Sequence, residues 1–476
     1  MRFVGRQRLF AWLDEELARV TPSHGRFLAL RGRRQVGKSR LVTEWLGRQD
    51  RPYLYYQALN KPVDQELESF AAAIGRSNLG ALPSLVGAGV RWAGWEQAFD
   101  TLVLAGGEGP LGDAPAVIVI DELPYLIDND PSFEATLQAA WDHKLQHTGI
   151  LLIVIGSDLH MMEALGSYDR PLYQRIDVQR QIHPLNVAEV ADLLDSDPVD
   201  SFDTYLMTGG FPKVVASRAE HRTTAKFLEA AMQDEAHPLV YTGEQILSAE
   251  FPPGVNARTV LEAIGAGERA WSALASRTGI QGRNLSLSID KLIDKGVVSA
   301  DDPRCIRQIS KRTRYRVNDP YLRFWLRFLA DRVPDISRGR GDLVHADVTS
   351  SWHDYAGTAV EPLVQESVAR LLPDERFASA NYVGAFWTRD NQVQVDLVGT
   401  EKDAKNRRIE FAGSVKWRDR KQFSAADADE LRMLAEQVPG CETTTRMVGV
   451  SRTGFNDHVD LDVRLTPQDL LEGWRY

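Results

Sequence analysis

The chain has 476 residues, of which 43% are hydrophobic and 26% charged, a composition typical of a globular protein and not of a disordered or fibrous one. Its 56 Lys+Arg against 66 Asp+Glu give a formal net charge of -10, which argues against a protein that coats nucleic acid over its whole surface. Cys305 and Cys441 are the only cysteines, too few for a disulfide scaffold or a thiolate zinc site.

The sequence predicts a cytoplasmic protein without a membrane anchor. Residues 1–10 alternate arginines with apolar residues and lack the long apolar stretch of a signal peptide. The most hydrophobic segment, Ile150–Ile155, spans six residues, whereas a membrane-spanning helix needs about twenty. We therefore expect no membrane contact.

Short aliphatic runs alternate with longer helical patterns in the first part of the chain. The runs are Phe27–Arg31, Tyr53–Tyr56, Ala116–Ile120 and Ile150–Ile155. Near-continuous aliphatic runs are typical of strands buried on both faces, so they predict a parallel sheet between helical layers. The first domain, residues 1–186, is therefore expected to be an α/β unit.

Helical patterns replace the strand-like runs beyond Pro184. Residues 187–248, with a break at Thr208–Pro212, predict a small helical lid. In residues 249–333, three helical segments precede a stretch typical of a two-stranded hairpin. The helical segments are expected at 258–264, 271–278 and 285–293, and the hairpin at 296–316. Three helices followed by a hairpin predict a winged helix-turn-helix.

An aromatic helix and a polar linker are predicted to join this module to a last domain. Spacings of three and four place Tyr321, Phe324, Trp325 and Phe328 on one helical face, which favours an interdomain core contact over base stacking. Residues 334–341 predict a Gly/Arg linker. The last domain, residues 344–476, is expected to be a second α/β unit. Its strands are predicted at 392–398, at 408–411 with Val415, and at 445–450.

Residues Gly32–Ser39 match the phosphate-loop pattern G-x-x-x-x-G-K-[ST] between an apolar strand and an amphipathic helix. Glycines allow backbone N–H groups to surround phosphates, and the helix N-terminus adds a favourable dipole. We expect Lys38 to contact the β- and γ-phosphates and the Ser39 hydroxyl to bind magnesium. The predicted nucleotide-binding residues are Gly32, Arg33, Arg34, Gln35, Val36, Gly37, Lys38, Ser39 and Arg40. An unoccupied glycine turn is the alternative interpretation.

Two carboxylates, Asp121 and Glu122, end a later aliphatic strand. With the phosphate loop they predict a hydrolytic site, in which Asp121 holds magnesium through water and Glu122 orients or deprotonates the attacking water. Without that loop, the pattern would indicate only a solvated strand end. The segment Asn60–Val63 has Val where a guanine-reading motif needs a carboxylate, so ATP is favoured over GTP.

Further catalytic candidates follow the strand that ends at Gly156. If this strand lies between the other two, Ser157 faces the γ-phosphate and acts as a polar sensor; the alternative is a helix N-cap at Ser157 or Asp158. Arg170 and Arg175 come next, and Arg175 is the predicted catalytic arginine. Either can be an arginine finger toward a nucleotide in this or a neighbouring subunit, or an ordinary surface arginine.

Residues 246–330 contain 14 Lys+Arg and 8 Asp+Glu, a local charge of +6 in a chain of -10. The cations of the proposed wing are Arg304, Arg307, Lys311, Arg312, Arg314 and Arg316. Arg283 precedes the proposed recognition helix with Asn284 and Ser286, which can reach base edges. Double-stranded DNA is therefore the predicted partner, and the alternative is a winged helix that packs against the ATPase or another subunit.

Three features together resemble a known family. Residues 3–9 look like the motif that precedes the phosphate loop in many AAA+ and STAND-type ATPases. Residues 155–162 with 171–175, and then 208–212, look like the sensor strand and lid of the archaeal-type ATPases of the MNS branch. Residues 319–325 are similar to the segment that joins their winged helix to a C-terminal domain resembling PD-(D/E)XK nucleases. The resemblance spans almost the whole chain and implies an ATPase core, a lid, a DNA-binding module and a nuclease-like tail.

In such tails, an early Glu, a strand-borne Asp and a Glu-x-Lys on the next strand bind magnesium and activate water. By resemblance, Glu361 matches the early acid, Asp396 the strand acid and Lys416 the lysine. Ser414 stands where the family has a carboxylate, and an uncharged hydroxyl coordinates magnesium weakly. We therefore expect an inactive nucleic-acid-binding or structural domain, with an active nuclease as the alternative.

The predicted fold class is α/β, a P-loop NTPase parallel-sheet core with a helical lid, a winged helix-turn-helix and a C-terminal α/β nuclease-like domain. The predicted function is that of an AAA+/STAND-like ATPase that uses ATP and Mg2+ and couples its nucleotide state to DNA association. One alternative is an ATP-gated regulatory switch without cleavage; another is an ATP-dependent nuclease with a degraded site. A homo-oligomer or a protein partner is compatible with the sequence.

Overall fold

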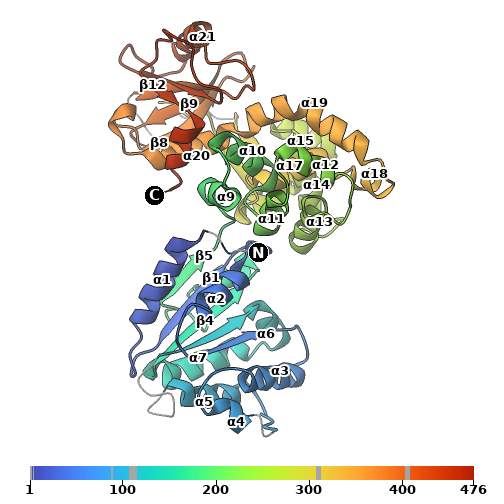
Figure 1. The fold of residues 1–476 in the computed structure, drawn as a ribbon, viewed down its shortest axis with the longest axis vertical. Helices are drawn as coiled ribbons and strands as arrows, with labels where there is room; N and C mark the ends of the chain where they lie inside the picture. Colours follow the sequence, from blue (N-terminus) through green and yellow to red (C-terminus); the bar gives the residue numbers. More distant parts are fainter. Residues whose placement is uncertain are drawn as a thin grey trace. The chain divides into compact units, whose positions relative to one another are not determined.

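A computed structural model describes residues 3, 5–86, 89–106, 115–306, 312–402 and 408–475. The chain divides into two compact units, Met1–Pro184 and Leu185–Tyr476, and each is described by itself (Figure 1). Within the described ranges, no helix has the length and apolar character needed to cross a membrane.

The first unit is built on a five-stranded parallel sheet with the order β2-β3-β4-β1-β5. The strands are β1 (Arg26–Arg31), β2 (Tyr53–Gln57), β3 (Ala116–Asp121), β4 (Ile150–Gly156) and β5 (Val178–Gln181). All residues of β3 and β4 are buried, as expected of aliphatic strands covered on both faces. The predicted α/β class and four of these strands are confirmed, whereas the edge strand β5 was missed because its Val-Gln-Arg-Gln sequence has no aliphatic run.

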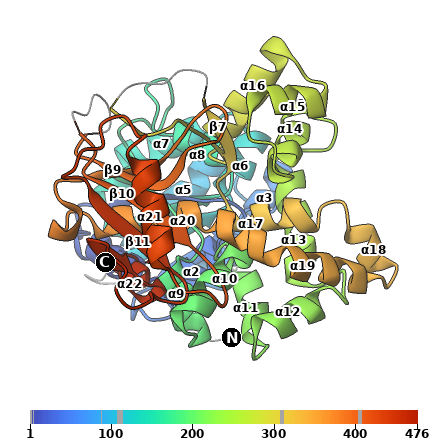
Figure 2. The ribbon, with the colours of Figure 1, turned by 90° about the horizontal axis from the view of Figure 1, so that it is seen from above.

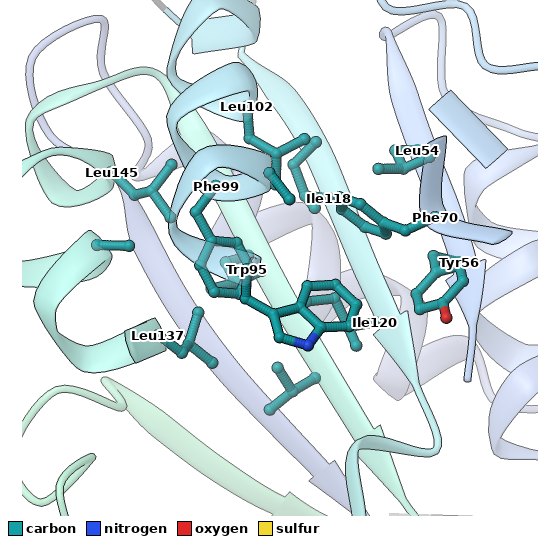
Figure 3. Close-up of a cluster of buried hydrophobic side chains, with 14 of the residues drawn as sticks. Leu54, Tyr56, Phe70, Trp95, Phe99, Leu102, Ile118, Ile120, Leu137 and Leu145 are labelled. Atoms are coloured by element: carbon teal, nitrogen blue, oxygen red, sulfur yellow. The ribbon is translucent and has the colours of Figure 1, made fainter. Parts of the chain in front are cut away.

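Helices cover both faces of this sheet (Figure 1). They are α1 (Gln7–Ala18), α2 (Lys38–Leu46), α3 (Val63–Gly75), α4 (Leu82–Val86), α5 (Trp95–Gly106), α6 (Leu123–Asn129), α7 (Phe133–His143), η1 (Leu145–His147) and α8 (Leu159–Ala164). On the α5 face, Trp95 packs against Phe70 and Phe133, with ring centroids 5.5 and 5.0 Å apart. Figure 3 shows Trp95 over the side chain of Ile120, so aromatic rings anchor α5 to the sheet.

The second unit begins with five helices. They are α9 (Val187–Leu194), α10 (Pro198–Thr208), α11 (Pro212–Ala219), α12 (Thr224–Ala231) and α13 (Pro238–Glu250). The predicted break lies between α10 and α11, where Gly209 and Gly210 have φ of 55° and 73°. A Cβ on Gly210 would lie 1.8 Å from the Leu185 carbonyl oxygen, so both conformation and close packing require glycine there.

Three helices and a hairpin follow in the predicted order. The elements are α14 (Asn256–Gly265), α15 (Trp271–Thr278), α16 (Gly282–Asp294), β6 (Val298–Asp301) and β7 (Arg314–Val317). Together, they are called the helix–hairpin module. In Figure 2 its three helices lie side by side, and β6 pairs with β7 in antiparallel register from Val298 opposite Val317. Two of the predicted wing cations, Arg307 and Lys311, lie outside the described residues.

The next helices form a connected layer instead of a linker. They are α17 (Pro320–Phe328), α18 (Val333–Ser337) and α19 (Gly341–Ala359). The α17 aromatics are buried, and the indole Nε1 of Trp325 donates to the Val240 carbonyl oxygen at 2.6 Å, so the predicted core contact is confirmed. The linker predicted at 334–341 was wrong, because α18 occupies much of it. Gly341 then begins α19 against the Met232 carbonyl, where there is no room for a Cβ.

The C-terminal part contains a second five-stranded sheet with the order β12-β11-β10-β9-β8. Its elements are α20 (Glu361–Leu371), η2 (Glu375–Phe377), β8 (Tyr382–Trp387), β9 (Gln394–Thr400), β10 (Phe411–Lys416), α21 (Ala425–Ala435), β11 (Arg446–Ser451), β12 (Val463–Leu465) and α22 (Pro467–Glu472). β9 runs antiparallel to β8 and β10, and α21 lies across β9, β10 and β11 (Figure 2). β8 and β12 were not predicted, since β8 contains Gly384 and Ala385 and β12 has only three residues.

Candidate active site

The phosphate loop joins the end of β1 to the start of α2. Gln35 and Gly37 both have left-handed backbone conformations, with φ of 66° and 88°. A Cβ on Gly32 would lie 2.4 Å from the Ile182 carbonyl oxygen, so glycine is required there. The following helix begins at Lys38, and its N-terminus offers free backbone N–H groups and a favourable dipole for an anion.

Lys38 is folded back onto this loop. Its ammonium nitrogen donates to the carbonyl oxygens of Gly32 at 2.7 Å and Arg33 at 3.1 Å. Burial lowers the pKa of Lys38, while the Glu122 and Asp121 carboxylates act in the opposite sense. Those two carbonyl contacts hold the Lys38 ammonium group against the loop.

Ser39, Asp121 and Tyr55 form a hydrogen-bonded group beside the loop. The Ser39 hydroxyl donates to Asp121 Oδ2 at 2.6 Å, and the Tyr55 hydroxyl donates to the same oxygen at 2.5 Å. Burial and the Asp121 carboxylate raise the pKa of Tyr55, so its hydroxyl remains a donor. Hydroxyl and carboxylate oxygens are the hard ligands that magnesium prefers, so Ser39 and Asp121 fit Mg2+ with phosphate and water completing the shell.

Glu122 and Ser157 meet at the same edge of the sheet. Glu122 has a left-handed backbone conformation, with φ of 56°, and its Oε2 accepts a hydrogen bond from the Ser157 hydroxyl at 2.8 Å. β4, which precedes Ser157, lies between β1 and β3, the condition on which the sensor interpretation depended. The α8 N-cap is supplied by Asp158, whose carboxylate accepts from the Met161 N–H.

The remaining loop residues lie around this centre. Val36 is buried, Arg40 is exposed with its guanidinium 6.0 Å from the Phe3 ring, and Arg34 donates to the Tyr125 hydroxyl at 3.0 Å. The described residues include no group of three or more His, Cys, Asp or Glu side chains that could hold a metal ion. A magnesium ion at Ser39 and Asp121 would therefore depend on the nucleotide for its other ligands.

Arg175 lies away from this group. Its guanidinium pairs with Asp142, with Nη2 3.0 Å from Oδ2. Two residues further along the chain, the Asp177 N–H donates to the carbonyl oxygen of Phe27, at the N-terminal end of β1. The phosphate loop follows the C-terminal end of the same strand. A six-residue strand, about 20 Å long, separates the two edges. Arg175 is thus not brought to the phosphate loop of its own chain, and a role toward a neighbouring subunit stays a prediction. Arg170 pairs with Glu134.

Two residues of the site were missed in the sequence. Tyr55 is opposite Val119 in the β2–β3 register and shares a face with Asp121, but this pairing depends on a strand order that the sequence does not reveal. Arg6 is buried and donates to the carbonyl oxygens of Val36 at 3.3 Å and His183 at 2.6 Å. The resemblance of residues 3–9 to an ATPase motif was the available signal for Arg6.

The nuclease-like residues gather only in part. Asp396 on β9 accepts from the Val415 N–H at 2.8 Å and lies 3.4 Å from the Ser414 hydroxyl. Burial raises the pKa values of Asp396 and Glu361, and the neighbouring Asp396 carboxylate raises that of Glu361 further. Lys416 pairs with Glu430 of α21 at 3.0 Å. The arrangement has two carboxyls near each other and a serine where a third acid would stand.

Three of the wing cations, Arg304, Arg314 and Arg316, contact the C-terminal sheet and its loops or their own hairpin. The Arg314 guanidinium lies 4.4 Å from the Trp387 ring centroid and donates to Asn391 at 2.7 Å. Arg304 donates to the Thr400 hydroxyl at 3.2 Å, and Arg316 pairs with Asp301 at 3.0 Å. In contrast, α16 exposes Arg283 and Asn284, with Ser286 half-buried. Among the described residues of the module, Arg283 and Asn284 of α16 are thus exposed, whereas Arg304, Arg314 and Arg316 are half-buried.

One family of proteins and one individual protein are similar to this chain in sequence, and the description of neither states an activity. Residues 325–429 match a family described as "Archaea bacterial proteins of unknown function". An uncharacterized protein of Methanocaldococcus jannaschii is 23% identical over 426 residues, covering 88% of each chain.

Several solved structures are also similar. A Walker-type ATPase of Pyrococcus abyssi is 18% identical, covering 68% of this chain and 96% of that one, with a TM-score of 0.48. The ORC2 protein of Aeropyrum pernix is 14% identical, covering 72% and 93%, with a TM-score of 0.46. The RuvB branch migration motor of Thermotoga maritima is 15% identical, covering 63% and 90%, with a TM-score of 0.31.

Proposed function

We propose that this protein is an ATPase of the AAA+/STAND type that binds ATP with Mg2+ and couples its nucleotide state to DNA association. The observation that supports it most is the meeting of Lys38, Ser39, Asp121, Glu122 and Ser157 at one edge of the parallel sheet. These residues come from the ends of three adjacent strands. Their side chains supply a cation, magnesium ligands and a carboxylate base, which are the groups that phosphoryl transfer to water requires.

In this proposal each side chain has a separate task. Lys38 leaves its two loop carbonyls and contacts the terminal phosphates, while Ser39 and Asp121 hold Mg2+, which supplies positive charge to the phosphate oxygens. Glu122 orients water and accepts its proton. The Ser157 hydroxyl holds Glu122 before ATP binds and turns to the γ-phosphate afterwards, which frees the carboxylate.

Tyr55 is expected to position Asp121 for magnesium. Tyr55→Phe removes one donor to a buried carboxylate, a type of hydrogen bond that contributes about 1.5–3 kcal/mol. We expect a several-fold rise in the Mg2+ concentration for half-maximal turnover, with unchanged binding of fluorescent ADP in EDTA. Tyr53→Phe, on the same strand, is the matched control. An unaltered Mg2+ requirement in Tyr55→Phe would show that the contact has no role in metal binding.

DNA association is proposed to use the exposed face of α16. Arg283 and Asn284 are exposed there, within a segment of local charge +6.

Duplex DNA is expected to stimulate ATP turnover, and binding should weaken steeply between about 50 and 200 mM salt because phosphate contacts release counterions. Arg283→Ala should reduce the slope of log affinity against log salt by about one, whereas Arg338→Ala should not. The measurements are turnover and fluorescence anisotropy with labelled duplex. If DNA neither binds nor stimulates, the regulatory-switch alternative is favoured.

We propose a non-cleaving role for the C-terminal domain. Ser414 contributes a hydroxyl instead of a carboxylate beside Asp396, and Lys416 pairs with Glu430. Both features weaken magnesium binding and water activation at this site. The domain instead packs with the helix–hairpin module through Arg314 and Trp387, which supports a structural or nucleic-acid-positioning role.

A further inference from the structure

Two adjoining cavities lie within the second unit, between the helix–hairpin module, the helices α17, α19 and α20, and the strands β8 and β9. Their volumes are about 790 and 310 Å³. They share the lining residues Arg269, Tyr315, Arg316 and Thr358, so they lie side by side, and together they are called the hollow. Neither the phosphate loop nor the exposed face of α16 borders it, whereas Glu361 of the nuclease-like group lines the larger cavity.

The smaller cavity has an excess of positive charge. Four arginines and one carboxylate line it, namely Arg269, Arg316, Arg323, Arg327 and Asp354. The Arg323 guanidinium donates to the carbonyl oxygens of Val317 and Ala359, and Arg327 donates to that of Ala266, so backbone groups and not acids hold them. Of these four arginines, only Arg316 forms an ion pair among the described residues, and its partner is Asp301.

Arg269, Arg316 and Arg323 are half-buried and Arg327 is exposed, so water screens the charge of the first three only in part. Burial, together with the charges of Arg316 and Arg269, lowers the pKa of Arg323 to about 10, while Tyr355 and Asp319 act in the opposite sense. Burial and Arg269 also lower the pKa of Arg314, which lines the larger cavity, while the Glu361 carboxylate in the same wall acts in the opposite sense. Clustered, partly desolvated cations repel one another unless an anion compensates them.

We propose that this hollow binds a phosphate-bearing ligand, with Arg269, Arg316, Arg323 and Arg327 holding the phosphate in the smaller cavity. Planar guanidinium groups present paired N–H donors that match phosphate oxygens, and several of them converge here. The adjoining cavity of about 790 Å³ has Trp387 and Gln394 in its wall and room for the remainder of a nucleotide. Its four arginines are matched there by four carboxylates, Asp301, Asp302, Glu361 and Glu366, so the positive excess belongs to the smaller cavity. The phosphate belongs either to a small molecule or to the end of a nucleic-acid strand, and the two sources are separable by experiment.

The test uses the full-length Lys38→Ala protein, in which the phosphate loop is disabled. Binding of inorganic pyrophosphate is measured by calorimetry, and binding of a 5′-phosphorylated single-stranded oligonucleotide by fluorescence anisotropy. Adding Arg269→Gln or Arg327→Gln should weaken at least one probe about tenfold, since each removes a charge-assisted hydrogen bond. Arg277→Gln, an exposed arginine of α15 outside the hollow, is the matched control. Thermal unfolding of each variant verifies that it is folded.

Each outcome of these measurements either supports the proposed phosphate site or contradicts it. Loss of pyrophosphate binding in Arg269→Gln and Arg327→Gln assigns a small phosphorylated ligand, and loss of oligonucleotide binding alone assigns a strand end. The proposal is overturned if folded Arg269→Gln and Arg327→Gln proteins bind both probes as tightly as the Lys38→Ala parent, or if that parent binds neither. Since every measurement is made without a working phosphate loop, the result does not depend on whether the protein hydrolyses ATP.

Discussion

Lys38→Ala is expected to reduce ATP turnover by about 100- to 1,000-fold, the loss that follows removal of one donor to a developing oxyanion charge. The lysine ammonium is buried beside the loop and has two carbonyl partners, Gly32 and Arg33, that a phosphate can replace. Alanine removes the cation that contacts both of those carbonyls. The fold should persist, because the lysine contributes only these two hydrogen bonds, each worth about 1 kcal/mol.

The measurements are phosphate release at saturating ATP, titration with fluorescent ATP, and circular dichroism. Lys144→Ala is the matched control, because Lys144 is an exposed lysine of the same unit that pairs with Asp100. It should change neither turnover nor binding. A folded Lys38→Ala protein with undiminished turnover would contradict the proposed nucleotide site.

Local sequence patterns were sufficient for the phosphate loop and the aliphatic strands. Gly32–Ser39 is a contiguous motif whose glycine requirement arises from its own backbone geometry and from one neighbouring carbonyl, that of Ile182. β3 and β4 are continuous aliphatic runs because both of their faces are covered, and such runs are visible without knowledge of any partner. The P-loop type of α/β fold therefore followed from short segments.

Features that depend on pairing between distant segments were not predictable from these patterns. Tyr55 reaches Asp121 only because β2 lies beside β3, and the strand order is a tertiary property. Arg175 looked like a finger candidate from its place after Ser157, but the chain returns to the opposite edge of the sheet before β5 begins. Proximity in sequence gave no information about which edge it would reach.

The basic wing shows that a charge count does not identify the partners of the charged side chains. The charge of residues 246–330 indicated a polyanion contact along the hairpin, yet Arg304 and Arg314 contact β8, β9 and neighbouring loops of the C-terminal sheet. Arginine packs on aromatic rings and amide oxygens as readily as on phosphates, so a count of cations does not distinguish the two. The contacts of each guanidinium group in the structure distinguish these partners.

Glu122→Gln is expected to lower the rate of ATP hydrolysis by about 100- to 10,000-fold, the usual contribution of a general base, while ATP binding remains. Glutamine retains an oxygen that can accept the hydrogen bond from the Ser157 hydroxyl, now 2.8 Å from Glu122 Oε2. The substitution therefore preserves that contact and removes the negative charge and the proton acceptor. Lys38, Ser39 and Asp121 are unaltered, so nucleotide and Mg2+ should still bind.

This retained contact separates a catalytic from a structural role for Glu122. If its carboxylate serves only to fix Ser157 at the end of β4, glutamine should support nearly full turnover. If it activates water, a single round of hydrolysis by pre-bound ATP should slow to the same extent as steady-state turnover, and ATP should accumulate on the protein. Glu68→Gln, an exposed residue of α3, is the matched control. Rapid-quench measurement of bound ATP and ADP distinguishes these outcomes, because a defect in product release would leave the single round of hydrolysis fast.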